Sequence, residues 1–125
     1  MIACSIRSIF EQSISALIQS TKFTQFCNSI KSKGLEEQVS DIIRNINTTS
    51  NLQQISNSSG INYNSLKNML IPDDFKNSIK NAHLGAHKST TYITKEQIEN
   101  LAKKSSFFLV IINEIINNQK IVLWI

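Results

Sequence analysis

Glycine and proline are scarce in this sequence, which holds three glycines and one proline in 125 residues. An all-β sandwich or barrel needs many tight turns, and these two residue types supply most of the backbone conformations that such turns require. The same scarcity leaves no glycine-rich loop of the kind that binds phosphates in nucleotide-binding domains. We therefore predict an all-α chain that folds as a single domain over residues 1–125, since roughly 100 to 200 residues is the usual size of one domain.

Apolar residues recur at spacings of three and four through most of the chain, which is the pattern of amphipathic helices. This pattern predicts an up-and-down bundle of about five to six helices. The polar run at 47–51 and Gly60 have the composition of turns. The predicted helices cover the longer ranges 2–19, 23–32, 35–46, 72 to 84 or 85, and 94–116, with short helical pieces at 52–58 and 63–70 on either side of Gly60.

Two of the predicted boundaries depend on particular residues. Gly34 follows the second apolar stripe and is expected to end that helix. Pro72, followed by Asp73 and Asp74, predicts the start of a helix. Proline needs no backbone donor at this position, and the carboxylates interact favourably with the positive end of the helix dipole.

The last predicted helix is the most hydrophobic, and we expect it to lie at the centre of the bundle. Thr94 and Gln97 have the spacing of a capping box at its start. Phe107 and Phe108 are predicted core residues, and the short apolar tail at 120–125 is expected either to pack on the bundle or to join a partner. The other members of the predicted buried stripe are Ile98, Leu101, Ala102, Ser105, Leu109, Ile112, Ile115 and Ile116.

Charge and cysteine content favour a soluble cytoplasmic protein. The formal charge is +4, a modest bias that permits a nucleic-acid partner without requiring one. Cys4 and Cys27 are too few for a disulfide framework or a zinc cluster, so we interpret them as small apolar residues of a reduced protein. Arg7 and Glu11 interrupt the apolar pattern that a secretory signal would need. The longest apolar run, at 107–112, is far shorter than the roughly 20 residues of a membrane span.

Both histidines of the chain lie in the segment 79–87, close behind a lysine. His83 and His87 share one helix face if the helix continues past Gly85, but a helix end at this glycine is an equally good interpretation. A histidine that titrates near neutral pH can move a proton, and Lys80 supplies fixed positive charge for a developing phosphorane anion. Two histidines are too few for a metal site. The residue types suit metal-independent cleavage of a phosphodiester.

This segment resembles the C-terminal signature of the HEPN superfamily. The resemblance rests on Lys80 and Asn81, the Gly-Ala-His sequence at 85–87, and the capped helix that follows a loop; Arg7 and Glu11 also match an Arg-x3-Glu pattern in the first helix of one branch. The most similar branches are the abortive-infection C-terminal domains and other defence-associated HEPN-like domains. The resemblance implies a helical bundle that dimerises so that two copies of the motif face each other, and catalytic members cleave RNA without a metal ion.

The resemblance also implies roles for individual residues. His87 would be the general acid and base, Asn81 would position the substrate, and Lys80 would stabilise the phosphate where the family has arginine. Lysine lacks the bidentate fork of a guanidinium, so it would hold a phosphate less firmly. Arg7 and Glu11 would support the motif, although their spacing also fits a simple stabilising pair. No cofactor is implied.

The segment can also be aligned with the motif in a second way. Lys76 and His83 have the same spacing as Lys80 and His87, so His83 is an auxiliary catalytic candidate, and Lys76 and Lys88 are candidates for nucleic-acid contacts. The implied partners are a second copy of the chain, RNA, and a larger protein of a phage-defence or toxin-antitoxin system.

Two other functions are consistent with the sequence. Residues 52–69 have the layout of a helix-turn-helix, in which the side chains that lead the second helix would contact base edges: Asn62, Tyr63, Asn64 and Ser65. Ser59 stands where that motif usually buries an apolar side chain, and Lys67 is the one cation of the predicted recognition helix. The other alternative is a non-catalytic subunit that dimerises or binds a partner protein, in which Lys80 and His87 only cap and pack the bundle.

Overall fold

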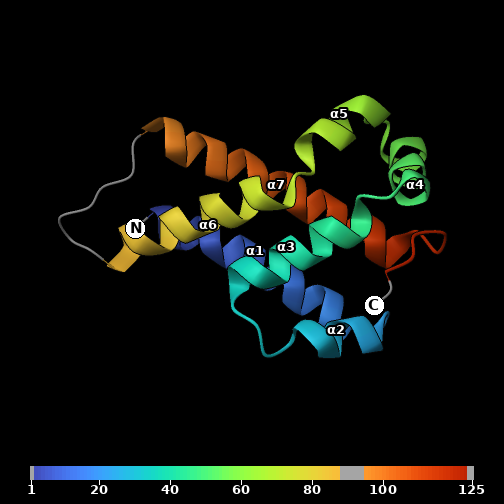
Figure 1. Cartoon of the computed structure of the whole chain (residues 1–125), viewed down its shortest axis with the longest axis horizontal. Helices are drawn as coiled ribbons and strands as arrows, with labels where there is room; N and C mark the ends of the chain where they lie inside the picture. The colour runs from blue at the N-terminus through green and yellow to red at the C-terminus, as the bar shows by residue number, and fades with distance from the viewer. Residues whose placement is uncertain (1, 88–94, 124–125) are drawn as a thin grey trace.

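The computed structural model describes residues 2–87 and 95–123, with side chains at 6–81 and 95–123. These residues form an all-α bundle, with no strand in the described part of the chain (Figure 1). The helices are α1 (Ile2–Gln19), α2 (Thr24–Ile30), α3 (Leu35–Ile46), α4 (Thr49–Ser59), α5 (Tyr63–Met69), α6 (Pro72–His87) and α7 (Lys95–Asn117). The predicted fold class is confirmed. The described residues hold seven helices because both short pieces around Gly60 are helices in their own right.

The core lies where α1, α6 and α7 meet. Phe10, Phe75 and Phe108 come from these three helices, and their ring centroids lie 6.5, 5.4 and 6.4 Å apart. All three side chains are fully buried. Aromatic pairs at such distances gain about 0.5–1.5 kcal/mol beyond the burial of their surface. The three rings therefore fix the relative positions of the helices that carry the candidate site.

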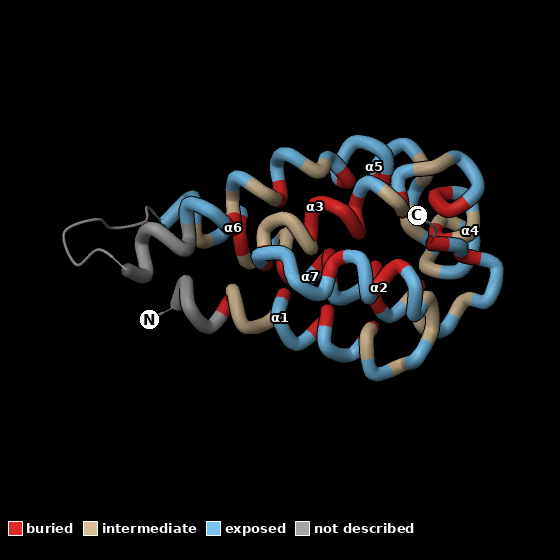
Figure 2. Tube along the Cα trace, turned by 60° about the horizontal axis from the view of Figure 1, so that its bottom comes forward, coloured by how far each residue is buried: buried red, intermediate tan, exposed pale blue. Residues whose placement is uncertain are grey.

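The remaining helices cover this centre from two sides. Helix α3 packs against α6 and α1, and α2 packs against the end of α1 and against α3. Helices α4 and α5 pack together near the end of α7. The start of α1 and the end of α6 lie at the same end of the molecule, far from α4 (Figure 1). Buried residues line the inward sides of the helices (Figure 2).

Several predicted boundaries and core positions can be compared with the structure. Helix α6 begins at Pro72 with Asp73 and Asp74 in its first turn, as predicted. The prediction for Gly34 is wrong: α2 ends at Ile30, and Gly34 precedes α3 as its N-cap, with extended backbone. Thr94 lies outside the described residues.

The predicted stripe of the last helix is buried or partly buried except at one position. Phe107 and Phe108 are buried, as expected, but Leu109 is 42% exposed. Ile111 takes a core position that the prediction did not include. The reason is geometrical: Ile111 lies on the same flank of the buried row as Phe107, whereas Leu109 lies on the opposite flank, which faces away from the core.

The loop between α1 and α2 combines strained backbone with a long-range contact. Thr21 and Phe23 have φ values of 59° and 53°, in the left-handed region that side chains with a Cβ rarely adopt. Between them, the Nζ of Lys22 donates hydrogen bonds to the carbonyls of Ile115 and Ile116, at 3.1 and 2.8 Å. These carbonyls have no partner within the last turn of α7, so Lys22 caps that helix from another part of the chain.

The segment after α7 is held by one buried amide. The Nδ2 of Asn51 donates to the carbonyl of Val122 at 2.8 Å, and the Oδ1 of Asn51 accepts from the Val122 N–H at 3.1 Å. Ile121 and Leu123, on either side, are buried, while Val122 is exposed. Within the described residues, no helix is long and apolar enough to span a membrane.

Candidate functional site

The candidate site lies on the outer half of α6. The backbone is helical through His87, so the helix does not end at Leu84 or Gly85 as expected. One glycine inside a helix costs only about 1 kcal/mol relative to alanine, which neighbouring turns can offset. Lys80 and Asn81 are both exposed. The side chains of His83 and His87, and all of Lys88, lie outside the described residues.

The continuous helix fixes the register of the site positions. Positions 80, 83 and 87 are separated by three and four residues, so their backbone positions lie along one side of α6. At 1.5 Å per residue, this stretch is about 10 Å long. Ile79, next to Lys80, is fully buried and anchors the helix to the core. Of the two interpretations of this segment, the structure therefore supports one uninterrupted helix rather than a helix end between His83 and His87.

Arg7 and Glu11 on α1 form the ion pair that their spacing predicts. The Nε of Arg7 lies 3.6 Å from the Oε1 of Glu11, with side chains 22% and 58% exposed. This distance is too long for a good hydrogen bond. The Nη1 of Arg7 is buried and has no hydrogen-bond partner within the described structure. The pair is therefore loose and leaves one donor of the guanidinium unsatisfied.

A cleft of about 380 Å³ lies beside this pair, between α1 and the start of α3. Its walls combine the charged side chains of Arg7 and Glu11 with Gln38 and with apolar residues of both helices. No local sequence pattern indicates this cleft, because Gln38 comes from a helix that is distant in sequence. The spacing of Arg7 and Glu11 is the one sequence signal for this cleft, because these two residues form one of its walls.

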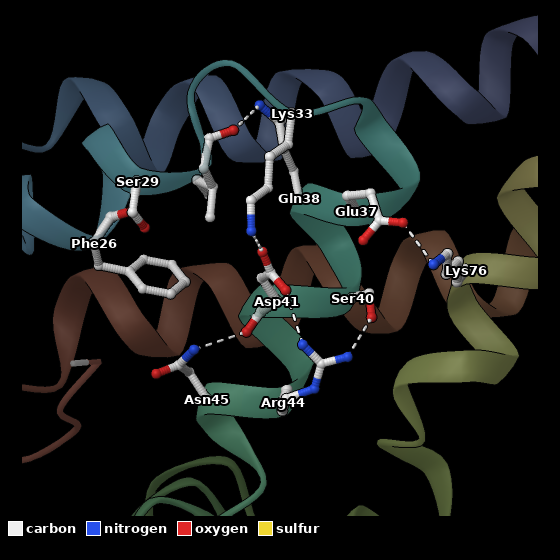
Figure 3. Close-up of polar contacts among 11 residues, drawn as sticks. Phe26, Ser29, Lys33, Glu37, Gln38, Ser40, Asp41, Arg44, Asn45 and Lys76 are labelled. Atoms are coloured by element: carbon white, nitrogen blue, oxygen red, sulfur yellow. Dashed lines mark hydrogen bonds and ion pairs between the residues drawn. The ribbon is translucent and has the colours of Figure 1, made fainter. Parts of the chain in front are cut away.

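Lys76 is partly exposed and contacts α3. Its Nζ lies 2.5 Å from the Oε1 of Glu37 (Figure 3). The hydrogen bond with Glu37 and the attraction of that carboxylate raise the pKa of Lys76 above its ordinary value. Since its charge is already balanced by Glu37, this lysine connects α6 to α3 and is a weaker candidate for a nucleic-acid contact than Lys80.

The same face of α3 carries a second cluster of charges. Asp41, which is almost buried, accepts from Lys33 at 2.6 Å and from Arg44 at 2.9 Å (Figure 3). Arg44 also lies 3.4 Å from the hydroxyl of Ser40. One carboxylate thus holds two cations, and the cluster ties the loop before α3 to the helix itself. We interpret it as structural.

The helix-turn-helix alternative can also be compared with the structure. Helices α4 and α5 do flank Gly60, whose φ of 79° is in the left-handed region. However, the Oδ1 of Asn62 accepts from the N–H groups of Asn64 and Ser65, at 2.9 and 3.3 Å. The side chain proposed to contact base edges therefore caps its own helix. Helix α5 has seven residues, which makes it a short recognition element.

A second hollow of the described surface has no signal in the sequence pattern. It measures about 720 Å³ and lies between α4 and the end of α7. Amide side chains form most of its lining, including Gln54, Asn57, Asn113 and Asn117. It lies at the opposite end of the molecule from the end of α6 (Figure 1).

Among the described residues, no group of three or more histidine, cysteine, aspartate or glutamate side chains is placed to hold a metal ion. Cys27 is buried, and its burial raises the pKa of its thiol. Its Sγ lies 3.8 Å from the carbonyl of Lys22. Comparison of the chain with protein families, with curated proteins and with solved structures finds no match.

Proposed function

We propose that this chain is a HEPN-like domain that binds RNA through the outer half of α6 and, as a homodimer, cleaves it without a metal ion. The observation that supports this proposal best is the continuity of α6 through His87. It aligns an exposed lysine and two histidine positions on one side of a helix whose inner side is anchored in the core. A short row of cations and imidazoles is a suitable surface for a ribose-phosphate strand.

The proposed chemistry is an internal transfer of the phosphoryl group. An imidazole of His87 removes the proton of a ribose 2′-hydroxyl, and the 2′-oxygen attacks the adjacent phosphorus. The bond to the 5′-oxygen breaks, and that oxygen takes up a proton from the protonated imidazole of the second copy. The products are a 2′,3′-cyclic phosphate and a 5′-hydroxyl end.

The other residues of the segment have supporting roles. The ammonium group of Lys80 stabilises the extra negative charge of the phosphorane, and the amide of Asn81 positions the phosphate by hydrogen bonding. His83 is an auxiliary proton carrier on the same side of the helix. The family resemblance extends this proposal to a role in phage defence or in a toxin-antitoxin pair.

The test is cleavage of a labelled single-stranded RNA in the presence of a chelator. We expect His87→Ala to lower the rate at least about 100-fold, which is the usual contribution of a general acid or base. Lys80→Ala should lower the rate, and Lys80→Arg should preserve it. Lys31→Ala is the matched control, because Lys31 is an exposed lysine after α2, away from α6. Circular dichroism establishes that each variant is folded.

Two results would contradict the proposal. One is intact RNA after incubation with the folded wild-type dimer. The other is an unchanged rate for His87→Ala, which would assign the cleavage to another part of the chain or to a contaminant.

A non-catalytic interaction subunit is the second candidate, and one observation favours it. Leu109 and Val110 are neighbours on α7 and are 42% and 39% exposed. Exposed apolar side chains at adjacent positions suit a protein contact. If this is the function, Leu109→Lys should abolish self-association, whereas His87→Ala should leave it unchanged.

A further inference from the structure

The unsatisfied guanidinium nitrogen of Arg7 indicates a ligand. A buried donor without a partner is costly, and the cost is larger when the group is charged. The Nη1 of Arg7 is in this state, and the Nε of the same side chain lies 3.6 Å from Glu11. The ion pair is long and the Glu11 carboxylate is mostly exposed, so this carboxylate is free to turn toward a ligand, whereas the Arg7 side chain is held in a mostly buried position. Arg7 also lines the adjacent cleft, so an acceptor bound there would add hydrogen bonds to its guanidinium group.

The cleft has the volume of a small-molecule site. Its volume of about 380 Å³ is within the range of roughly 300–1,000 Å³ that such sites occupy. Ile14 and Leu35 are buried and form an apolar wall, to which the partly buried Ile18 adds. A donor group and an acceptor group thus stand side by side next to an apolar surface, which favours a flat ligand with a polar edge.

We propose that this cleft binds a guanine base. The O6 and N7 atoms of guanine accept two hydrogen bonds from one guanidinium fork. The N1–H and the 2-amino group, on the adjoining edge, donate two hydrogen bonds to one carboxylate. Arg7 and Glu11 would therefore each bind guanine in a bidentate manner, while Ile14 and Leu35 contact its face. Adenine offers only one acceptor beside one donor, so it satisfies each side chain less well.

The position of the cleft connects it with RNA. Phe10, one turn after Arg7 on α1, contacts Phe75 of α6 with ring centroids 6.5 Å apart. The start of α1 and the end of α6 lie at the same end of the molecule (Figure 1). This inference rests on the proposed function in one respect: it takes the guanine base to come from a guanosine of the bound RNA strand. The cleft would then select where along the strand α6 binds.

The experiment is a titration of the full-length protein with guanosine, adenosine, inosine and inorganic phosphate, followed by calorimetry. We expect guanosine to bind at least about tenfold more tightly than adenosine, as for other bidentate base contacts. Inosine, which lacks the 2-amino group, should bind less tightly than guanosine. Glu11→Gln should remove the preference for guanosine. Glu96→Gln, at an exposed glutamate of α7, is the matched control and should retain it.

The source of the base is tested with two RNA strands of equal length, one of uridines alone and one with a single central guanosine. The guanosine-containing strand should bind more tightly, and Glu11→Gln should make the two equal. Equal affinity of wild-type protein for both strands would overturn the assignment to RNA.

Failure of this inference is distinguishable from failure of the proposed function. Guanosine binding by the His87→Ala variant, which is not expected to cleave, supports the inference independently of catalysis. Absence of guanosine binding overturns it, whatever the protein does to RNA. Binding of inorganic phosphate without binding of guanosine also overturns it, since Arg7 would then belong to a simple anion site.

Discussion

Asn51 is predicted to be the most important polar residue for the stability of the fold. It is 3% exposed, although amide side chains are usually on the surface. Its side chain makes three hydrogen bonds: two with the backbone of Val122 and one, at 3.2 Å, with the carbonyl of Asn45. One amide thus joins the end of α3, the start of α4 and the segment after α7.

The size of the effect of Asn51→Ala follows from these contacts. Each hydrogen bond contributes about 0.5–1.5 kcal/mol, so three bonds contribute about 1.5–4.5 kcal/mol. Water can pair the exposed backbone of Val122 in the variant, which lowers the cost. Loosening this segment also exposes Ile121 and Leu123, which raises it. We expect the free energy of unfolding to fall by about 2–3 kcal/mol, which is a large fraction of the roughly 5–15 kcal/mol of a typical domain.

The assay is urea denaturation followed by far-ultraviolet circular dichroism. Asn57→Ala is the matched control: Asn57 is an exposed asparagine of the same helix, and its side chain only accepts from Gln53. The control should change the free energy of unfolding by no more than about 0.5 kcal/mol. If Asn51→Ala is as mild as the control, the three hydrogen bonds do not stabilise the fold and the reasoning is refuted.

Two further predictions concern the loop between α1 and α2. Lys22→Met keeps the apolar stem but removes the donors that cap α7, so it should lower the free energy of unfolding by about 1–3 kcal/mol. The control Lys31→Met should have almost no effect. Equal effects of the two substitutions would contradict the capping role of Lys22. Thr21→Gly should raise the thermal midpoint, because it relieves about 1 kcal/mol of left-handed strain. Thr24→Gly, in the first turn of α2, should lower it, and a lower midpoint for Thr21→Gly would show that the loop is not strained.

Local patterns in the sequence were sufficient to predict the helices. The three- and four-residue spacing of apolar side chains is a property of each helix alone, and Pro72 marks a start by its own chemistry. Gly34 and Gly85 were misjudged because glycine fits several positions at a helix end and is tolerated inside a helix. Which of these applies depends on contacts with other helices, and the sequence pattern does not contain them.

For the candidate site too, local sequence patterns indicate the contacts within one helix but not the contacts between helices. The ion pair between Arg7 and Glu11 follows from their spacing on one helix, and it is present in the structure. The ion pair of Lys76 with Glu37 joins two helices that are distant in sequence, so no local pattern indicates it. The cleft beside Arg7 needs Gln38 from α3 for the same reason.

The most direct test of the central claim is the chemistry of the RNA ends. Wild-type protein is incubated with a defined single-stranded RNA in a chelator, and the fragments are analysed by mass spectrometry. Internal transfer by His87 and Lys80 predicts fragments with a 2′,3′-cyclic phosphate and fragments with a 5′-hydroxyl. Fragments with 3′-hydroxyl and 5′-phosphate ends, or intact RNA, would contradict the proposed role of α6.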